Sequence, residues 1–388
     1  MSGGLRVAVI GIGNMGSAHA AALFRGDVPR ATLAAVCDTA RDRREWAAQN
    51  LPDVPAFATA DELFAAGAAD AVIVATPHYL HPPLAVAAFE RGWHVLTEKP
   101  GGVRLRDVWA MRDAARASGR VFGVMFNQRT HPLFQRARQI VRGGELGVPK
   151  RLQWTVTNWY RPQAYYDSGT WRASWAGEGG GVLLNQAPHQ LDLWQWIFGM
   201  PQTVRAYCAC GKYHRIEVED DAAIFAEYAS SATATFITST GEYPGTNRLE
   251  IAGDRGKLVL EEEVLRLYRL PQAERTFCFG DGTLPPVTCE EMRSPGRESG
   301  HVGILRNFVE AVLNGTPLLA PGEEAANELA LSNAAYLSAW TGEAVSLPPD
   351  NERFERLLAE RAAHSTYRPG WAAVEADGEY KTRWNVTW

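Results

Sequence analysis

The feature that most constrains the fold is a glycine-rich turn that directly follows a short apolar segment near the N-terminus. Residues 5–10 are apolar and rich in β-branched side chains, which is typical of a buried parallel strand. A helical stretch follows over 17–25, and the connecting turn reads Gly11-Ile12-Gly13-Asn14-Met15-Gly16. A strand, this glycine spacing and a helix together predict the first unit of a dinucleotide-binding domain.

Each glycine of this turn has a physical task. Gly11 permits the tight turn, Gly13 lets the backbone approach a pyrophosphate, and Gly16 lets the helix pack closely on the strand. The pyrophosphate would lie on the free N–H groups at the start of the helix, where Asn14 and Met15 stand. We therefore expect these five residues to bind the cofactor.

The next apolar strand identifies the cofactor more closely. Residues 32–37 end in Asp38, about 20 positions beyond the fingerprint, where a carboxylate binds the ribose hydroxyls. A carboxylate there favours NAD and repels the extra phosphate of NADP, although Arg41 and Arg43 partly offset that repulsion. The sequence predicts NAD, with NADP as the less favoured alternative.

Two further strands end in polar residues. The apolar runs 71–75 and 93–96 read as parallel strands, and ligands bind at the carboxyl ends of such strands. The residues expected to face the cofactor there are Thr76, Pro77, His81, Glu98 and Lys99.

The pattern changes near residue 125. Alternating or β-branched segments without regular helices between them predict a largely antiparallel sheet over 151–160, 204–210, 222–228, 233–240, 248–252 and 257–268. Apolar periodicity predicts helices over 301–314 and 322–341. We expect a nucleotide-binding domain over 1–125, a substrate and oligomerisation domain over 126–345, and a C-terminal tail over 346–388, of which residues 365–388 read as irregular.

The motifs together resemble the Gfo/Idh/MocA family of oxidoreductases. The matching residues are Gly11-x-Gly13-x-x-Gly16-x-x-His19, Ala75-Thr76-Pro77 with His81, Glu98-Lys99-Pro100, Gly179-Gly180-Gly181, Pro188-His189-Gln190-Leu191-Asp192 and Ile251-Ala252-Gly253. The resemblance implies an α/β protein: a doubly wound parallel Rossmann sheet followed by an α+β domain with a large, open, mostly antiparallel sheet. It implies NAD(P)-linked chemistry on sugars, cyclitols or related polyols, and a homodimer or homotetramer formed through the free face of the second sheet.

A predicted helix over 182–198 carries the catalytic candidates. Asn185, His189 and Asp192 are spaced i, i+4, i+7 and would share one face of that helix. An imidazole titrates near the working pH, so His189 is the best base; the alternative is a satisfied core histidine. Lys99 would stabilise developing alkoxide charge, and Asp192 would orient His189 or bind a substrate hydroxyl. The resembling inositol dehydrogenases usually have aspartate where this chain has Asn185, which weakens a proton relay there.

Aromatic and basic residues predict a carbohydrate pocket, against the alternative of core aromatics and surface arginines. The expected substrate contacts are Asn127, Arg129, Tyr160, Arg161, Arg172, Trp175, Asn185 and His189. Lys212, Tyr213 and His214 form a third polar cluster, and converging cations would favour an anionic carbohydrate.

Composition removes other classes of function. A net charge of −5 argues against nucleic acid, and no apolar run reaches the roughly 20 residues that span a membrane. The chain shows no secretory leader, and its five scattered cysteines suggest neither a disulfide framework nor a metal site, so we expect a cytoplasmic protein.

The leading interpretation is an NAD-dependent sugar or cyclitol dehydrogenase. The runner-up is an NAD-dependent redox glycosidase, which some members of the resembling family are. A non-catalytic NAD-binding sensor is third, because Lys99 and His189 are both present.

Overall fold

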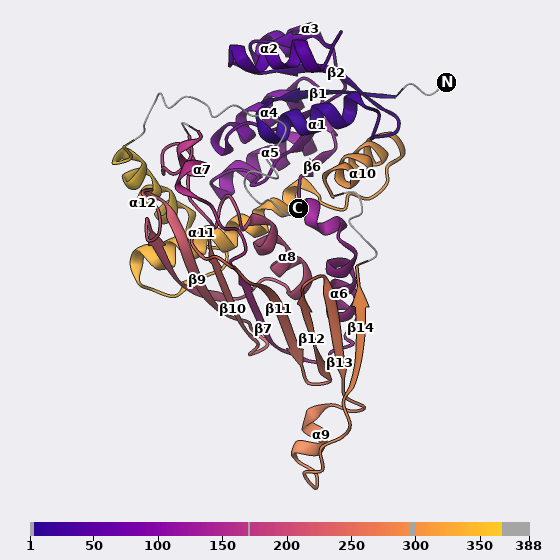
Figure 1. The fold of residues 1–388 in the computed structure, drawn as a ribbon, viewed down its shortest axis with the longest axis vertical. Coiled ribbons are helices and arrows are strands. Elements are labelled where there is room, and N and C mark those ends of the chain that lie inside the picture. The colour runs from indigo at the N-terminus through magenta and orange to yellow at the C-terminus, as the bar shows by residue number, and fades with distance from the viewer. Residues whose placement is uncertain (1–3, 170, 295–299, 367–388) are drawn as a thin grey trace.

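The computed structural model describes residues 4–169, 171–294 and 300–366. The N-terminal part contains a parallel sheet with strand order β3-β2-β1-β4-β5-β6 (Figure 1). Its strands are β1 (Leu5–Ile10), β2 (Ala31–Cys37), β3 (Ala56–Phe57), β4 (Ala71–Val74), β5 (His94–Thr97) and β6 (Phe122–Val124). Its helices are α1 (Asn14–Phe24), α2 (Arg41–Asn50), α3 (Ala60–Ala66), α4 (His81–Glu90) and α5 (Leu105–Ser118). This order confirms the predicted doubly wound dinucleotide-binding fold.

The second sheet is long and open. Its order is β14-β13-β12-β11-β7-β10-β9-β8-β15, and each pairing is antiparallel except that between β7 and β10. Its strands are β7 (Pro149–Val156), β8 (Thr203–Cys210), β9 (Glu219–Glu227), β10 (Thr233–Ser239), β11 (Asn247–Gly253), β12 (Gly256–Glu261), β13 (Val264–Arg269), β14 (Thr288–Arg293) and β15 (Val345–Ser346). The predicted mostly antiparallel sheet is confirmed.

One predicted strand is wrong. The segment 257–268 is a hairpin of β12 and β13, which turns at Glu262 and Glu263 with φ values of 50° and 59°. Tight hairpin turns usually contain glycine, asparagine or aspartate, and neither of these residues is one of them. The sequence pattern therefore gave no sign of a turn within this segment. Strand β14 was not predicted either, because it is mostly exposed and lacks apolar alternation.

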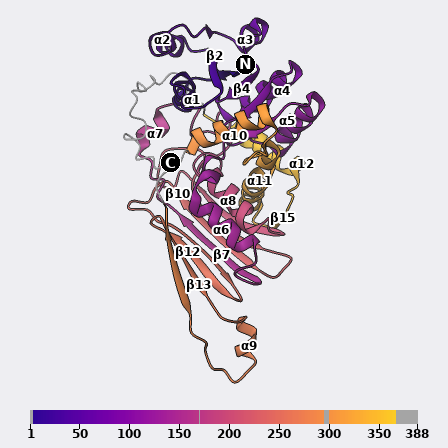
Figure 2. The same cartoon turned by 90° about the vertical axis from the view of Figure 1, so that its right-hand side faces the viewer.

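Helices cover one face of this sheet (Figure 2). They are α6 (Pro132–Arg142), α8 (Pro188–Phe198) and α11 (Ala325–Thr341). Trp194 of α8 stacks on Phe236 of β10, with ring centroids 5.9 Å apart. On the opposite face, Tyr207 is 73% exposed and Phe225 and Ile237 are each 44% exposed.

The chain after β14 returns to the N-terminal sheet. Helix α10 (Gly300–Asn314) lies beside that sheet in Figure 1, and the Val124 amide donates to the Ala320 carbonyl at 3.1 Å. The segment over 346–388, predicted as a tail, contains helix α12 (Asn351–Ala363), whose Phe354 stacks on Trp340. The tail tryptophans Trp371, Trp384 and Trp388 lie outside the described residues. No helix in the described ranges is long and apolar enough to cross a membrane.

Candidate active site

The glycine turn after β1 is built for close backbone packing. Gly11 has φ +84°, and a Cβ on it would lie 2.7 Å from the Ala75 carbonyl oxygen. A Cβ on Gly16 would lie only 1.7 Å from the Gly11 oxygen, so this residue must be glycine for α1 to approach β1. A Cβ on Gly13 would meet nothing within 4 Å, so the backbone there is open on its outer side. Asn14 and Met15 begin α1 directly after it, and no side chain caps that helix. This arrangement fits a pyrophosphate on the helix N-terminus.

Asp38 ends β2 beside this turn. Its carboxylate accepts the amide hydrogens of Ile12 at 2.8 Å and Ala40 at 2.9 Å, which fixes it next to the glycine turn. Past the end of β4, the Thr76 hydroxyl is buried without a hydrogen-bond partner among the described residues, and Pro77 follows it. A fixed carboxylate after β2 and an open hydroxyl after β4 flank the glycine turn at the carboxyl edge of the sheet, and they suit the hydroxyls of a dinucleotide.

His81 does not present a free nitrogen to a ligand, contrary to expectation. Its Nε2 lies 2.6 Å from the Thr76 carbonyl oxygen and its Nδ1 lies 2.8 Å from the Pro100 carbonyl oxygen. The ring is 1% exposed and joins the loops that follow β4 and β5. His81 therefore supports the cofactor edge through the backbone.

Glu98 and Lys99 follow β5, where Glu98 is buried and Lys99 is half-buried. The Glu98 carboxylate lies 2.6 Å from His19 Nε2 and accepts the Lys99 amide hydrogen at 3.1 Å. Burial alone would raise the pKa of Glu98, but the hydrogen bond and charge of His19, together with the charges of His301 and Lys99, outweigh burial and lower the pKa to about 2. Burial lowers the pKa of Lys99, and its Nζ donates to the Asn185 carbonyl at 2.7 Å. The chain thus holds a desolvated lysine at a strand end of the nucleotide-binding sheet.

The predicted helix over 182–198 is shorter than expected. Helix α8 begins at Pro188, and the residues before it form turns. Pro188 has no amide hydrogen and suits the first helical position, and the buried Glu219 carboxylate holds the preceding turns by accepting the Gly181 and Leu183 amide hydrogens at 2.9 Å each. Asn185 consequently precedes the helix. Its carbonyl faces Lys99, and its side-chain Nδ2 donates to Glu178 Oε1.

His189 lies in the first turn of α8 and is 4% exposed. Neither ring nitrogen has a hydrogen-bond partner among the described residues, and the Phe126 ring lies edge-on to the imidazole with centroids 6.4 Å apart. Burial, and then the Lys99 ammonium, hold the pKa of His189 well below its usual value. Buried polar groups are normally paired, so an open imidazole beside a lysine marks a place for chemistry.

Asp192 and Arg129 do not join His189 as expected. They form a two-point ion pair with each other, at 2.8 Å and 2.6 Å, and both are 0% exposed. Arg129 Nη1 also donates to Glu324 at 2.5 Å and to the Leu319 carbonyl at 3.1 Å. Since the Asp192 oxygens are occupied by Arg129 and Gln195, this carboxylate neither orients His189 nor awaits a substrate hydroxyl.

The predicted substrate residues separate into two groups. Near Lys99, the Tyr165 hydroxyl accepts from Arg172 Nη1 at 2.7 Å and from Gln186 at 3.1 Å, and Arg161 lies over the same tyrosine ring. Trp175 lies elsewhere: its ring packs in the core on Tyr336 and Trp340. The exposed Tyr160 contacts Tyr243 at the surface, and Asn127 has a buried side-chain oxygen without a partner among the described residues.

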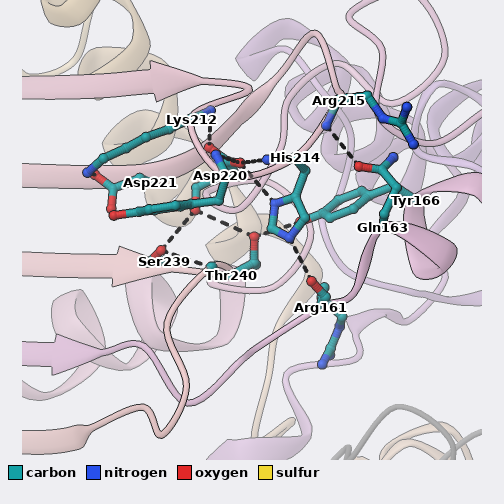
Figure 3. Close-up of polar contacts among 12 residues, drawn as sticks. Arg161, Gln163, Tyr166, Lys212, His214, Arg215, Asp220, Asp221, Ser239 and Thr240 are labelled. Carbon is teal, nitrogen blue, oxygen red and sulfur yellow. Dashed lines mark hydrogen bonds and ion pairs between the residues drawn. The ribbon is translucent and has the colours of Figure 1, made fainter.

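The cluster at residues 212–214 is held by Asp220 (Figure 3). The Asp220 carboxylate accepts the amide hydrogens of Lys212, Tyr213 and His214 at 2.8–2.9 Å. His214 Nδ1 also lies 2.9 Å from that carboxylate, and its Nε2 lies 2.7 Å from the Arg161 carbonyl oxygen. His214 thus ties this loop to the Arg161 segment, while Lys212 pairs with Asp221.

Sequence reasoning missed two residues of the site. Glu178 is 2% exposed and contacts Asn185, yet it lies in a loop without a recognised motif. His301 of α10 lies 5.6 Å from His19 between ring centroids and contributes to the lowered pKa of His189. Only the placement of Glu178 directly before the glycine run could have drawn attention to it.

Comparison with known proteins identifies the family. Residues 5–126 match the oxidoreductase family with an NAD-binding Rossmann fold, and residues 134–259 match the GFO/IDH/MocA C-terminal domain. The chain belongs to the Gfo/Idh/MocA family. It is an NAD-binding oxidoreductase, as the sequence predicted.

Similar proteins act on or bind cyclitols and sugar nucleotides. The chain is 26% identical over 344 residues to myo-inositol 2-dehydrogenase of Thermotoga maritima, covering 86% of this chain and 96% of that protein. It is 26% identical over 263 residues to scyllo-inositol 2-dehydrogenase (NAD(+)) of Bacillus subtilis, covering 66% and 73%. The WlbA dehydrogenase of Bordetella pertussis, in complex with NADH and UDP-GlcNAcA, is 27% identical with a TM-score of 0.75, covering 89% of this chain and 100% of that one.

Proposed function

We propose that this protein transfers hydride between NAD(H) and a hydroxyl-bearing carbon of a sugar, glycoside or cyclitol. The observation that carries the proposal is the juxtaposition of Lys99, at the end of a nucleotide-binding strand, with a buried imidazole whose two nitrogens have no partner among the described residues. The inositol dehydrogenases and the sugar-nucleotide complex among its relatives support the same class of substrate.

Bound NAD supplies the hydride acceptor or donor. In the oxidation direction, a ring nitrogen of His189 takes the proton of the substrate hydroxyl, and in reduction it returns that proton. Because burial and the Lys99 ammonium lower the pKa of His189, the ring is neutral at neutral pH and can accept a proton. We therefore expect the oxidation rate to stay level as the pH falls to about 6.5, the ordinary histidine value, and to decline only below it.

Lys99 has the complementary task. Its ammonium, desolvated and anchored on the Asn185 carbonyl, stabilises negative charge that develops on the reacting oxygen. The Asn185 side-chain oxygen lies in the same region and can accept a hydrogen bond from a substrate hydroxyl. Asp192 and Arg129 support this region by holding α8 in place.

An acidic group on the substrate is the finer part of the proposal. Arg172 lines a cavity of about 450 Å³ together with His214, Arg215 and Tyr166. Replacing Arg172 with glutamine should reduce kcat/KM for anionic sugars far more than for neutral ones, because a guanidinium binds carboxylate or phosphate oxygens. Equal losses for both would argue against an anionic substrate.

Self-association is proposed from the uncovered sheet face. Tyr207, Phe225 and Ile237 share one side of β8, β9 and β10 and are exposed. We propose that a second copy of the chain covers this face, as a homodimer or homotetramer. Light scattering of wild type and of Tyr207→Glu tests this, because a charge there should dissociate the oligomer; an unchanged mass would contradict it.

One assay tests the proposed function. The purified protein is mixed with NAD and with myo-inositol, scyllo-inositol, free hexoses, hexuronates, UDP-GlcNAcA and nitrophenyl glycosides, while NADH absorbance and nitrophenolate release are followed together. Accumulation of NADH that His189→Ala reduces by about 10² or more supports the dehydrogenase. Nitrophenolate release that requires NAD but leaves no net NADH would replace it with the redox glycosidase. Wild-type turnover by His189→Ala would refute the assignment of the base.

A further inference from the structure

Glu178 is a buried carboxylate that no motif explains. It is 2% exposed, and its Oε2 accepts the Ala173 amide hydrogen at 2.7 Å, while its Oε1 accepts from Asn185 Nδ2. Both of these donors are neutral amides. Burial raises the pKa of this carboxyl, while Arg172, Asn185 and Lys99 oppose the rise. A carboxylate in such surroundings needs a reason to be retained.

Glu178 reaches the reacting groups through one residue. Asn185 is held at two points, since its main-chain carbonyl accepts from Lys99 Nζ at 2.7 Å and its side-chain amide donates to Glu178. A shift of the Asn185 side chain is therefore coupled to Glu178, and a shift of its backbone to Lys99. The three residues form a short chain of hydrogen bonds from a buried acid to the proposed electrostatic catalyst.

The chemistry of the carboxylate fixes the orientation of the Asn185 amide. The NH₂ group of Asn185 donates to Glu178 Oε1, which is the orientation that an ionised carboxylate requires, because it accepts hydrogen bonds and cannot donate them. The Asn185 side-chain oxygen is then turned away from Glu178, and no hydrogen bond from the described residues reaches it. Glu178 thus determines that the Asn185 side-chain oxygen, and not its NH₂ group, is the atom left free to accept a hydrogen bond.

We propose that Glu178 is a positioning residue that presents the Asn185 side-chain oxygen to a hydrogen-bond donor of the substrate, a hydroxyl near the reacting carbon. The inference rests on the proposed function, because it takes the Lys99–His189 region as the substrate site. It also accounts for asparagine at this position. The negative charge belongs to Glu178, which does not contact the substrate, and the substrate meets only the neutral side-chain oxygen of Asn185.

Exchanging the two side chains tests this geometry. In Glu178→Gln, the oxygen of the introduced amide keeps the Ala173 hydrogen bond and its NH₂ group faces Asn185, so the Asn185 amide must turn over and present NH₂ to the substrate. In Asn185→Asp, two carboxylates face each other at hydrogen-bond distance. The double variant, Glu178→Gln with Asn185→Asp, restores one donor, one acceptor and a single charge, and it leaves one oxygen of the introduced carboxylate available to the substrate.

The expected pattern is specific to positioning. Glu178→Gln should raise KM for the best polyol about tenfold, with a smaller change in kcat, because Asn185 would present a hydrogen-bond donor where the substrate hydroxyl needs an acceptor. It should also improve, relative to wild type, the use of the O-methyl ether of the contacted hydroxyl, which accepts but cannot donate. The double variant should bind the polyol more tightly than either single variant. Glu145→Gln, which alters a partly exposed carboxylate paired with Arg136 and Arg269, is the matched control.

Several results separate the possibilities. Melting temperature and NADH fluorescence titration establish that each variant folds and binds cofactor, and polyol binding to the enzyme–NADH complex gives the same comparison without turnover. Wild-type KM and analogue preference in Glu178→Gln, with His189→Ala inactive, would overturn the role of Glu178 alone. A double variant no better than the single variants would overturn it too. Full turnover in His189→Ala would instead overturn the proposed function.

Discussion

Two buried polar clusters meet helix α8 within one turn of each other, and they differ in how completely their hydrogen-bonding groups are used. The paired cluster consists of Arg129, Asp192 and Glu324, joined by hydrogen bonds of 2.5–2.8 Å. The open cluster consists of Lys99, Glu178, Asn185 and His189, and in it neither His189 nitrogen has a partner among the described residues. Both clusters contain buried residues and charged residues, so neither burial nor the presence of charge identifies the active site.

The difference lies in unused hydrogen-bonding capacity. In the paired cluster, Arg129 is further surrounded by the rings of Phe126 and Trp196, so its charge is compensated on several sides. In the open cluster, burial lowers the pKa of Lys99, so its ammonium carries an electrostatic cost in the folded state, and both nitrogens of His189 are buried without a hydrogen-bond partner among the described residues. Such a cost persists where function uses it, whereas a satisfied ion pair only holds the fold together.

Removing the arginine of the paired cluster should have the largest effect. In Arg129→Met, Asp192 would remain buried without its partner, and we expect the free energy of unfolding to fall by about 3–5 kcal/mol. Denaturant unfolding of this variant beside Arg136→Met measures the difference, because Arg136 forms a partly exposed pair with Glu145 whose loss should cost no more than about 1 kcal/mol. Similar stability in the two variants would mean that the paired cluster is not structural.

The open cluster should respond in the opposite way. In His189→Leu, an unpartnered imidazole gives way to an apolar side chain of similar size, so the melting temperature should be unchanged or higher. Turnover should nevertheless fall by about 10² or more, because the proton acceptor is lost. Thermal unfolding and steady-state kinetics on the same preparation check both parts. If this variant were destabilised by more than about 1 kcal/mol, His189 would belong with the structural cluster.

The same contrast shows what sequence could predict. The nucleotide-binding sheet, its glycine turn and Asp38 follow from contiguous residues, because strand, turn and helix are local in sequence. The substrate side could be predicted only in outline. Helical spacing grouped Asn185, His189 and Asp192, but the structure divides them between two clusters.

Long-range partners decide that division. Asp192 forms an ion pair with Arg129, which lies 63 residues earlier. The turn that contains Asn185 is hydrogen-bonded to Glu219 of strand β9. Trp175 similarly packs on Tyr336 and Trp340 from α11, so an aromatic residue expected at the substrate lies in the core. Periodicity specifies which residues share a face, but it does not specify which distant side chain meets them.

Glu219 offers the finest test, because it is buried and fully hydrogen-bonded, and its hydrogen-bond donors among the described residues are all uncharged. It accepts from Gly181, Leu183 and the Tyr336 hydroxyl, and burial raises its pKa from 4.5 to about 7. Between these values the folded state keeps a proton that the unfolded state releases. The stability contributed by that proton is therefore complete below about pH 4.5 and is lost as the pH rises to about 7.

In Glu219→Gln this pH dependence should disappear. The variant should be less stable than wild type at pH 5, by about 1–3 kcal/mol, because one amide oxygen cannot replace the two oxygens of the protonated carboxyl group toward the Gly181 and Leu183 hydrogens. Its free energy of unfolding should then change less than that of wild type between pH 5 and pH 7, as denaturant titrations at several pH values would show. Glu352→Gln, which alters an exposed carboxylate on α12, should keep the wild-type slope. An unchanged slope in Glu219→Gln would assign the pH dependence to other groups and leave the turn before α8 insensitive to protonation.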